Sequence, residues 1–298
     1  MSNRPLFEVP YNFSLALLPY YKRNMERINF LFLPPYREDS INTRSSIETA
    51  KRGRCYMPTT RAEYEHHLQS IVSSGLRYVV LWQSDNVISE QILNYYCNLG
   101  ASGFIIANDC NAKIIKDFNP SLLVVASLVQ RLCSGITQRD FHYYDYVLLY
   151  YPFNRSLEGL KRLSFIKDKL VLMPNTFCHV NCPSMHHWFP SKEKSFNPKR
   201  DCMALRDSDS YAVHSGLISP DHLYLFDQYV SGYKLEGREY STKVIKFLCD
   251  SYFNRNSGKE MMETMLGNDI AKGIINEMDS MPLEDYYNRK TTDILDVL

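Results

Sequence analysis

Residues 78–107 read YVVLWQSDNVISEQILNYYCNLGASGFIIA, and they contain the clearest signal of the fold class. It begins with one apolar run, Tyr78–Trp82, and ends with another, Gly103–Ala107. Between them, the residues from Ser89 to Leu99 have the length and composition of a helix that stops at Gly100. Short apolar strands joined by a helix are typical of parallel strands buried on both faces. The stretch therefore predicts one strand–helix–strand unit of a parallel sheet.

The same unit recurs along the chain. Eight apolar runs of strand length occur, at residues 28–33, 78–82, 103–107, 122–126, 146–150, 170–173, 212–218 and 233–236. The clearest helix between them begins after Thr59 or Thr60, with Glu63 placed for a capping box. Eight strands alternating with helices favour a single α/β domain, a closed (β/α)8 barrel of the TIM type. An open doubly wound sheet is the alternative, although no glycine-rich phosphate loop follows the first run.

The flanking segments complete the expected organisation. Residues 5–27 are expected to form a lead-in segment and a first helix, Ser14–Arg27. The barrel domain then covers residues 1–257, and residues 258–298 form a polar, helical C-terminal extension.

The composition limits the classes of partner and compartment. The formal net charge is +1, so the charge points neither to nucleic acid nor to an anionic membrane surface. No apolar run approaches the roughly 18 residues of a membrane span, and the N-terminus lacks the apolar core of a secretory signal. We expect a cytoplasmic protein, in which the eight cysteines stay reduced.

The segment after the sixth apolar run differs from the rest of the chain. Residues 169–202 read KLVLMPNTFCHVNCPSMHHWFPSKEKSFNPKRDC, a strand followed by a polar loop that we place at residues 174–210. Cys178 and Cys182 form a C-x3-C pair, and Cys202 follows in the same loop. Thiolates on a loop at the end of a strand are the ligands of soft metals and iron–sulfur clusters. These three cysteines are therefore predicted metal ligands.

The identity of the metal and of the fourth ligand stays open at this point. A 4Fe-4S cluster takes four thiolates, whereas zinc accepts three thiolates and one histidine, here His186 or His187. Cys55 is the first choice for a fourth thiolate because its long loop, 36–58, leaves the same end of the barrel, and Cys110 is the second choice.

A barrel gathers the residues that follow its strands at the C-terminal end, where active sites lie. Glu236 and Arg238 follow the last run and, with His187, are the predicted catalytic residues, a structural ion pair between the first two being the alternative. The predicted substrate-binding residues, which also follow strands, are Arg54, Asn108, Asn154, Arg155 and Asn175.

Four stretches together resemble the collagenase-like peptidase family, also called the U-thirty-two family. They read FEVPYNFSLALL at residues 7–18, GRCYMP at 53–58, NTFCHVNCPSMHH at 175–187, and ISPDHLYLFDQYVSGYKLEGREYSTKVIKFLCDSY at 218–252. The last contains Ser219-Pro220-Asp221-His222-Leu223 and Lys234-Leu235-Glu236-Gly237-Arg238, which are similar to the paired signatures of that family.

The resemblance implies a TIM-barrel fold and a cysteine-ligated iron–sulfur cluster. Members of the family serve oxygen-independent hydroxylation, some together with a related subunit, and others are called peptidases. The resemblance also favours Cys55 as a cluster ligand. We therefore expect a redox enzyme or subunit that modifies a substrate, either a small molecule or a peptide, without molecular oxygen. A metal-dependent peptidase and a non-catalytic, metal-stabilised partner subunit are the alternatives.

Overall fold

Eight parallel strands close into a barrel, which confirms the predicted (β/α)8 fold class. The computed structural model describes residues 4–39, 58–84, 86–130, 140–149, 154–176 and 215–288. Each strand pairs with the next in sequence, and the last pairs with the first. The strands are β1 (Leu6–Pro10), β2 (Ile28–Leu33), β3 (Tyr78–Trp82), β4 (Gly103–Ile106), β5 (Leu123–Ala126), β6 (Tyr146–Leu148), β7 (Leu170–Leu172) and β8 (Gly232–Lys234).

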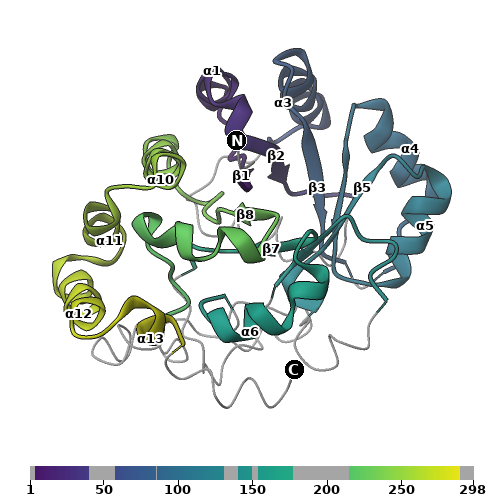
Figure 1. The fold of residues 1–298 in the computed structure, drawn as a ribbon. Helices are drawn as coiled ribbons and strands as arrows, with labels where there is room; N and C mark the ends of the chain where they lie inside the picture. Colours follow the sequence, from purple (N-terminus) through teal and green to yellow (C-terminus); the bar gives the residue numbers. More distant parts are fainter. Residues whose placement is uncertain are drawn as a thin grey trace, which may run out of the picture.

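Helices surround this barrel on the outside (Figure 1). The α-helices are α1 (Leu18–Arg23), α3 (Arg61–Ser73), α4 (Glu90–Asn98), α5 (Cys110–Phe118), α6 (Leu157–Arg162), α10 (Thr242–Asn254), α11 (Gly258–Leu266), α12 (Asn268–Asp279) and α13 (Leu283–Asn288). The 3-10 helices are η1 (Leu15–Leu17), η2 (Met25–Arg27), η3 (Leu128–Gln130), η6 (Ser164–Ile166), η9 (Pro220–Leu225) and η10 (Asp227–Tyr229). The helix predicted over 14–27 is therefore three short pieces, η1, α1 and η2.

Two segments differ from the expected strand pattern. The segment 5–10, predicted to be a lead-in, contains β1, which pairs with β2 on one side and β8 on the other. The strand predicted over 212–218 is wrong in its described part, residues 215–218, where only Ser215 forms a bridge. The barrel has no place for it, because β7 pairs directly with β8. The predicted number of strands is correct, but the strand β1 was not predicted and the segment 215–218 is not a strand of the barrel.

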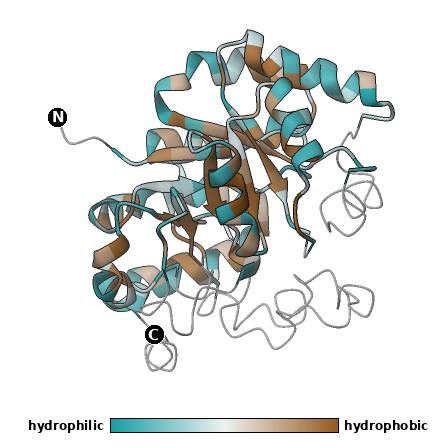
Figure 2. Cartoon of the chain, turned by 90° about the vertical axis from the view of Figure 1, so that its right-hand side faces the viewer, coloured by the Kyte–Doolittle hydropathy of each residue, from teal (hydrophilic) through white to brown (hydrophobic). Residues whose placement is uncertain are grey.

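The two faces of each strand have different surroundings. Side chains from β2 to β5 fill the barrel interior, namely Phe30, Phe32, Val79, Leu81, Ile105 and Val125. Alternate residues of the strands point outward and pack against the helices in a larger core. Figure 2 shows the strands as the most hydrophobic part of the chain, with hydrophilic residues on the outer surfaces of the helices.

Residues 258–288, the described part of the C-terminal extension, are mostly helical as predicted, and their helices pack on the outer core of the barrel. Figure 1 shows α10, α11, α12 and α13 following one another around one side, with α13 reaching α6. Met261, Ile274, Tyr286 and Tyr287 from these helices are buried in the same cluster as the outward side chains of the strands. None of the helices in the described ranges is long and apolar enough to span a membrane.

Candidate functional site

A carboxylate and an ammonium group are buried inside the barrel, where β1 meets β8. Glu8 pairs in register with Lys234, and their neighbours Phe7, Val9 and Tyr233 belong to the outer core. Because side chains alternate along a strand, Glu8 and Lys234 point to the interior. Their side chains are 1% and 6% exposed, and Lys234 Nζ lies 3.9 Å from Glu8 Oε2. Barrel interiors are usually filled by apolar side chains, so this pair is an exception.

Burial perturbs both groups in opposite directions. Loss of solvation raises the pKa of Glu8 from 4.5 to about 7, against the opposing attraction of Lys234. Loss of solvation also lowers the pKa of Lys234 from 10.5 to about 8, although Glu8 favours the ammonium form. In both groups burial therefore outweighs the mutual attraction, and either can lose or gain a proton near neutral pH. Within the described residues, neither Glu8 carboxylate oxygen accepts a hydrogen bond.

The predicted catalytic residues Glu236 and Arg238 lie beyond Lys234, in the turn after β8. Both interact electrostatically with Lys234, since Arg238 lowers its pKa and Glu236 raises it. Gly237 between them has a φ of 119°, a conformation that glycine adopts readily. Glu236 and Arg238 are both half-buried. The charges of this region therefore form one group that extends from the barrel interior to its C-terminal end.

Asn175 stabilises the backbone of this group. Its Nδ2 donates to Glu236 O at 2.9 Å, and its Oδ1 accepts from Glu236 N at 2.9 Å. The side-chain amide thus continues the hydrogen-bonding pattern between β7 and β8 beyond the last paired residues. Asn154 makes the equivalent pair of bonds with the backbone of Met173, which follows β7. Both amides were predicted to bind substrate, and the contacts in the structure are with the backbone.

Arg155, like the two amides, makes its hydrogen bonds to backbone groups. It is fully buried, and its guanidinium donates to Ser215 O at 2.8 Å and to Tyr286 O at 2.7 Å. The guanidinium carbon also lies 4.2 Å from the centre of the Tyr286 ring. Arg155 therefore attaches α13 to the barrel, and no substrate contact is needed to explain its burial.

Asn108 lies at the C-terminal end of β4, as predicted. It is half-buried, and its Oδ1 accepts from Cys110 N at 3.0 Å at the start of α5. Nearby, Gln83 Nε2 donates to Ser127 Oγ at 3.2 Å, which connects the ends of β3 and β5. These polar side chains line the same end of the barrel as Glu236, and the role of Asn108 in substrate binding stays a prediction.

The remaining predicted site residues lie outside the described residues. These are Arg54, Cys55, Cys178, Cys182, His187 and Cys202. Among the described residues, no group of three or more His, Cys, Asp or Glu side chains could hold a metal ion. Cys110 is exposed, whereas Cys97 and Cys249 pack in the outer core, as predicted for the latter two.

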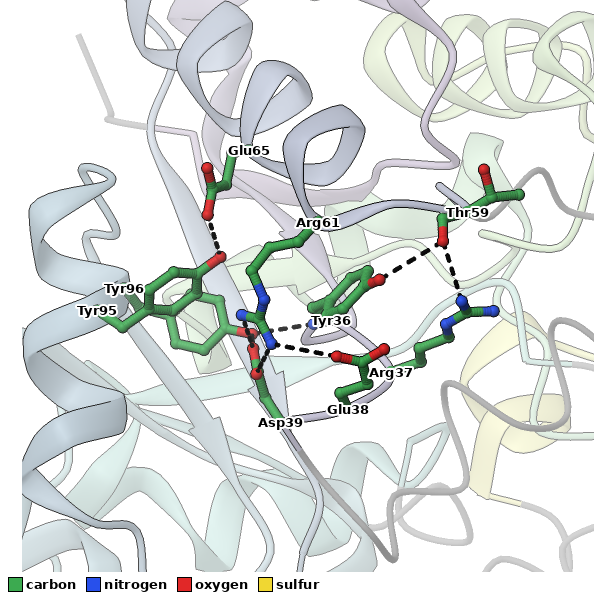
Figure 3. A network of polar contacts seen from close by, with 9 residues as sticks. All are labelled: Tyr36, Arg37, Glu38, Asp39, Thr59, Arg61, Glu65, Tyr95 and Tyr96. Atoms are coloured by element: carbon green, nitrogen blue, oxygen red, sulfur yellow. Dashed lines mark hydrogen bonds and ion pairs between the residues drawn. The ribbon is translucent and has the colours of Figure 1, made fainter.

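The two ends of the segment 40–57 are held in place by polar contacts (Figure 3). Asp39 Oδ1 accepts from Arg61 Nη2 at 2.7 Å, and Thr59 O accepts from Arg37 Nη2 at 3.0 Å. The first contact fixes the residues after β2 on α3, and the second joins the two ends of the segment directly. The segment predicted to supply a fourth thiolate thus starts and ends at the C-terminal side of β2.

Glu8 and Lys234 were missed as site residues. The signal was present, since each is a charged residue with apolar neighbours in a short strand, LFEVP and GYKLE. The sequence predicts Lys234 within the last strand and within the family signature, and it places Glu8 in a lead-in segment. Their proximity depends on the pairing of β1 with β8, which joins the two ends of the barrel sequence.

The geometry defines a closed (β/α)8 barrel with charged groups at its C-terminal end, and comparisons add little beyond that. No protein-family profile matches the chain, and no curated protein matches it. The solved U32 peptidase Mk0906 is similar, with 13% identity and a TM-score of 0.48 over 80% of this chain and 95% of that chain. The aminoacrylate-bound tryptophan synthase from M. tuberculosis has 13% identity and a TM-score of 0.44 over 91% and 94% of the two chains.

A third similar structure is the tryptophan synthase alpha-subunit from the hyperthermophile Pyrococcus furiosus. It has 11% identity and a TM-score of 0.39 over 92% of this chain and 98% of that chain. None of these TM-scores reaches 0.5, so neither a family nor an activity follows from them.

Proposed function

We propose that this protein is a barrel enzyme whose reaction takes place at the C-terminal end, on the charged face of β1 and β8. The observation that carries the proposal is the buried pair of Glu8 and Lys234. A desolvated carboxylate and amine that are 3.9 Å apart add little or nothing to the stability of a fold, and such perturbed groups cluster at functional sites. Both groups titrate near neutral pH, which suits general acid–base catalysis.

In this proposal Glu8 and Lys234 exchange protons with the substrate, and the groups above them hold it. Glu8 delivers or accepts the proton, because its carboxyl group changes protonation near pH 7. Glu236 and Arg238 orient the substrate at the end of β8, where the hydrogen bonds of Asn175 keep their backbone in place. Asn175 is then a positioning residue that acts through the backbone of Glu236.

We further propose that the cysteine segments bind an iron–sulfur cluster at this end of the barrel. The donor set fits, since Cys55, Cys178, Cys182 and Cys202 supply the four thiolates that a 4Fe-4S cluster takes. The described residues that precede these segments, Asp39 and Thr176, follow β2 and β7 at the same end. A bound cluster would supply electron transfer for a substrate modification without molecular oxygen, and the family resemblance favours this class of reaction.

The test is metal analysis and absorption of the full-length protein after anaerobic purification. A cluster predicts iron and sulfide together with a broad band near ~400 nm, both lost in a Cys178→Ser/Cys182→Ser variant. Cys97→Ser is the matched control, because Cys97 lies at the opposite end of the barrel among Arg77, Ala101 and Ser102. It should leave iron and absorption unchanged.

The outcome also separates the other candidate functions. A colourless protein that contains zinc and releases new amino termini from peptides would replace the redox proposal with a peptidase. A protein that binds metal and a related subunit, yet retains full partner activity after Glu236→Gln and Arg238→Gln, would be a non-catalytic partner.

A further inference from the structure

We propose that Lys234 is a nucleophilic amine that forms an imine with a small aldehyde or ketone, with Glu8 as its acid–base partner. This inference rests on the proposed reaction site at β1 and β8 but needs no cluster. It names the class of substrate for that site, a carbonyl compound.

The surroundings of Lys234 Nζ desolvate the nitrogen and leave its donors without hydrogen bonds. It lies 4.1 Å from the centre of the Phe32 ring, inside the barrel, and 3.9 Å from the closest Glu8 oxygen, two contacts that favour the ammonium form. Both distances are too long for a hydrogen bond. Within the described residues Lys234 Nζ makes no hydrogen bond, so its lone pair, once the proton leaves, is not held by a donor.

Two half-buried lysines among the described residues make hydrogen bonds through Nζ. Lys116 Nζ donates to Asp145 Oδ2 at 2.7 Å and to Leu122 O at 2.8 Å. Lys169 Nζ donates to two backbone carbonyl groups, Phe141 O at 2.8 Å and Tyr144 O at 2.7 Å. Each of these nitrogens thus makes at least two hydrogen bonds, whereas Lys234 Nζ makes none among the described residues.

The charged groups that face Lys234 come from two elements. Glu8 on β1 favours the ammonium form, as does Glu236 beyond β8, while Arg238 and burial favour the neutral amine. Burial is the largest of these influences, and it lowers the pKa of Lys234 to about 8. Desolvation in a hydrophobic pocket and a neighbouring cationic group are both known to activate a lysine as a nucleophile.

The reaction balances with the groups present. The neutral amine of Lys234 forms a bond to the carbonyl carbon, and the carbonyl π electrons move to oxygen, which takes up the proton lost by nitrogen. Glu8 in its carboxylic acid form then gives a proton to the departing hydroxyl group, which leaves as water as the C=N bond forms. Hydrolysis reverses the sequence and returns the proton to Glu8, so no oxidant or reductant is needed.

The experiment is reductive trapping in the full-length protein at pH 7 with glyoxylate and cyanoborohydride. Reduction of the imine leaves a carboxymethyl group on the amine, and trypsin does not cleave after the modified lysine. The label on Lys234 therefore appears in a peptide that runs from Asp207 to Arg238, instead of one that ends at Lys234. Lys259 on the surface of α11 is the internal reference in the same sample.

The expected result is that Lys234 is labelled at least about 10-fold faster than Lys259 at pH 7, since a pKa near 8 leaves far more neutral amine than an ordinary lysine has. Glu8→Gln should slow labelling of Lys234 about 10-fold or more without changing that of Lys259. Lys259→Arg should leave Lys234 labelling unchanged. Lys234 labelling no faster than Lys259 in the folded wild-type protein overturns the inference.

Failure of this inference and failure of the proposed function are distinguishable. An unlabelled Lys234 in a protein that contains its cluster overturns the imine and leaves the redox proposal standing. A labelled Lys234 in a protein without iron or sulfide supports the imine and removes the redox proposal. Because the comparison of two lysines is made within the wild-type protein, it does not depend on whether a Lys234 variant folds.

Discussion

Neutralising the buried pair with the double substitution Glu8→Gln and Lys234→Met is expected to stabilise the protein at pH 7.5. At a separation of 3.9 Å the attraction of the two charges is about 4 kcal/mol with an effective dielectric constant of about 20. Loss of solvation costs several kcal/mol for each ion. The pKa shifts of Glu8 and Lys234 both follow burial rather than attraction, so solvation dominates. The double variant should gain about 1–4 kcal/mol in the free energy of unfolding.

Each single substitution is expected to have the opposite effect. Lys234→Met leaves Glu8 buried without a cation, and Glu8→Gln leaves Lys234 buried without an anion. Removal of one partner from a buried pair costs about 3–5 kcal/mol. The two single variants and the double variant therefore form a double-mutant cycle, in which we expect a large coupling energy between Glu8 and Lys234.

The pH dependence of the gain follows from the pKa shifts. The pKa of Glu8 is raised in the folded state, so its contribution to stability is present below pH 4.5 and lost as the pH rises through about 7. The pKa of Lys234 is lowered, so its contribution is present above pH 10.5 and lost as the pH falls through about 8. The gain of the double variant should therefore be largest between pH 7 and 8 and smaller at pH 4.5 and at pH 10.5.

Urea denaturation of the wild-type protein, the two single variants and the double variant, followed by circular dichroism, measures these differences. Buffers at pH 5, 7.5 and 10 cover the expected decrease of the gain on both the acidic and the basic side of its maximum. A gain that does not change with pH, or a double variant whose loss equals the sum of the two single losses, would refute the reasoning. Either result would mean that the two groups are solvated or do not interact.

Two further predictions concern residues that hold the C-terminal end of the barrel. Asn175→Ala removes both hydrogen bonds to the backbone of Glu236 and should cost about 2–3 kcal/mol in urea denaturation, whereas the exposed Asn94→Ala should change stability by less than about 0.5 kcal/mol. Arg155→Met removes the bonds to Ser215 and α13 and should lower the free energy of unfolding by about 3 kcal/mol. Amide hydrogen exchange should become faster than in the wild-type protein in α13 but not in α3. Unchanged exchange in α13 would show that the helix is held by apolar contacts alone.

The part of the fold that sequence could predict is the part with local signals. The apolar runs that become β2 to β6 are buried on both faces, so their composition marks them wherever they pair. The start of α3 is equally local, because Thr60 Oγ1 accepts from Glu63 N at 3.2 Å and Glu63 Oε2 accepts from Thr59 N at 2.8 Å. Such contacts join residues a few positions apart, and the capping pattern predicts them from spacing alone.

The backbone contacts of Asn154, Arg155 and Asn175 could not be predicted in the same way. Each follows a strand, which is where substrate-binding residues of barrels occur, and the prediction rested on that position alone. In the fold, the side-chain amides of Asn154 and Asn175 hydrogen-bond to backbone groups just beyond the paired strand residues. Arg155 donates to a carbonyl group of α13. Those partners are distant in sequence and are brought close only by packing.

The sequence indicated a buried parallel sheet, because short apolar segments that alternate with helical segments can be buried on both faces only between helices. It left the closed barrel and the open doubly wound sheet as alternatives. Tertiary structure decided which segments are strands, since β1 and β8 are completed by closure of the ring. It also decided the chemistry of the interior. Glu8 and Lys234 stand near opposite ends of the barrel sequence, and only the pairing of β1 with β8 brings their charges to 3.9 Å in a desolvated space. Burial then moves both pKa values toward neutrality, an effect that depends on the surroundings of a residue and not on its type.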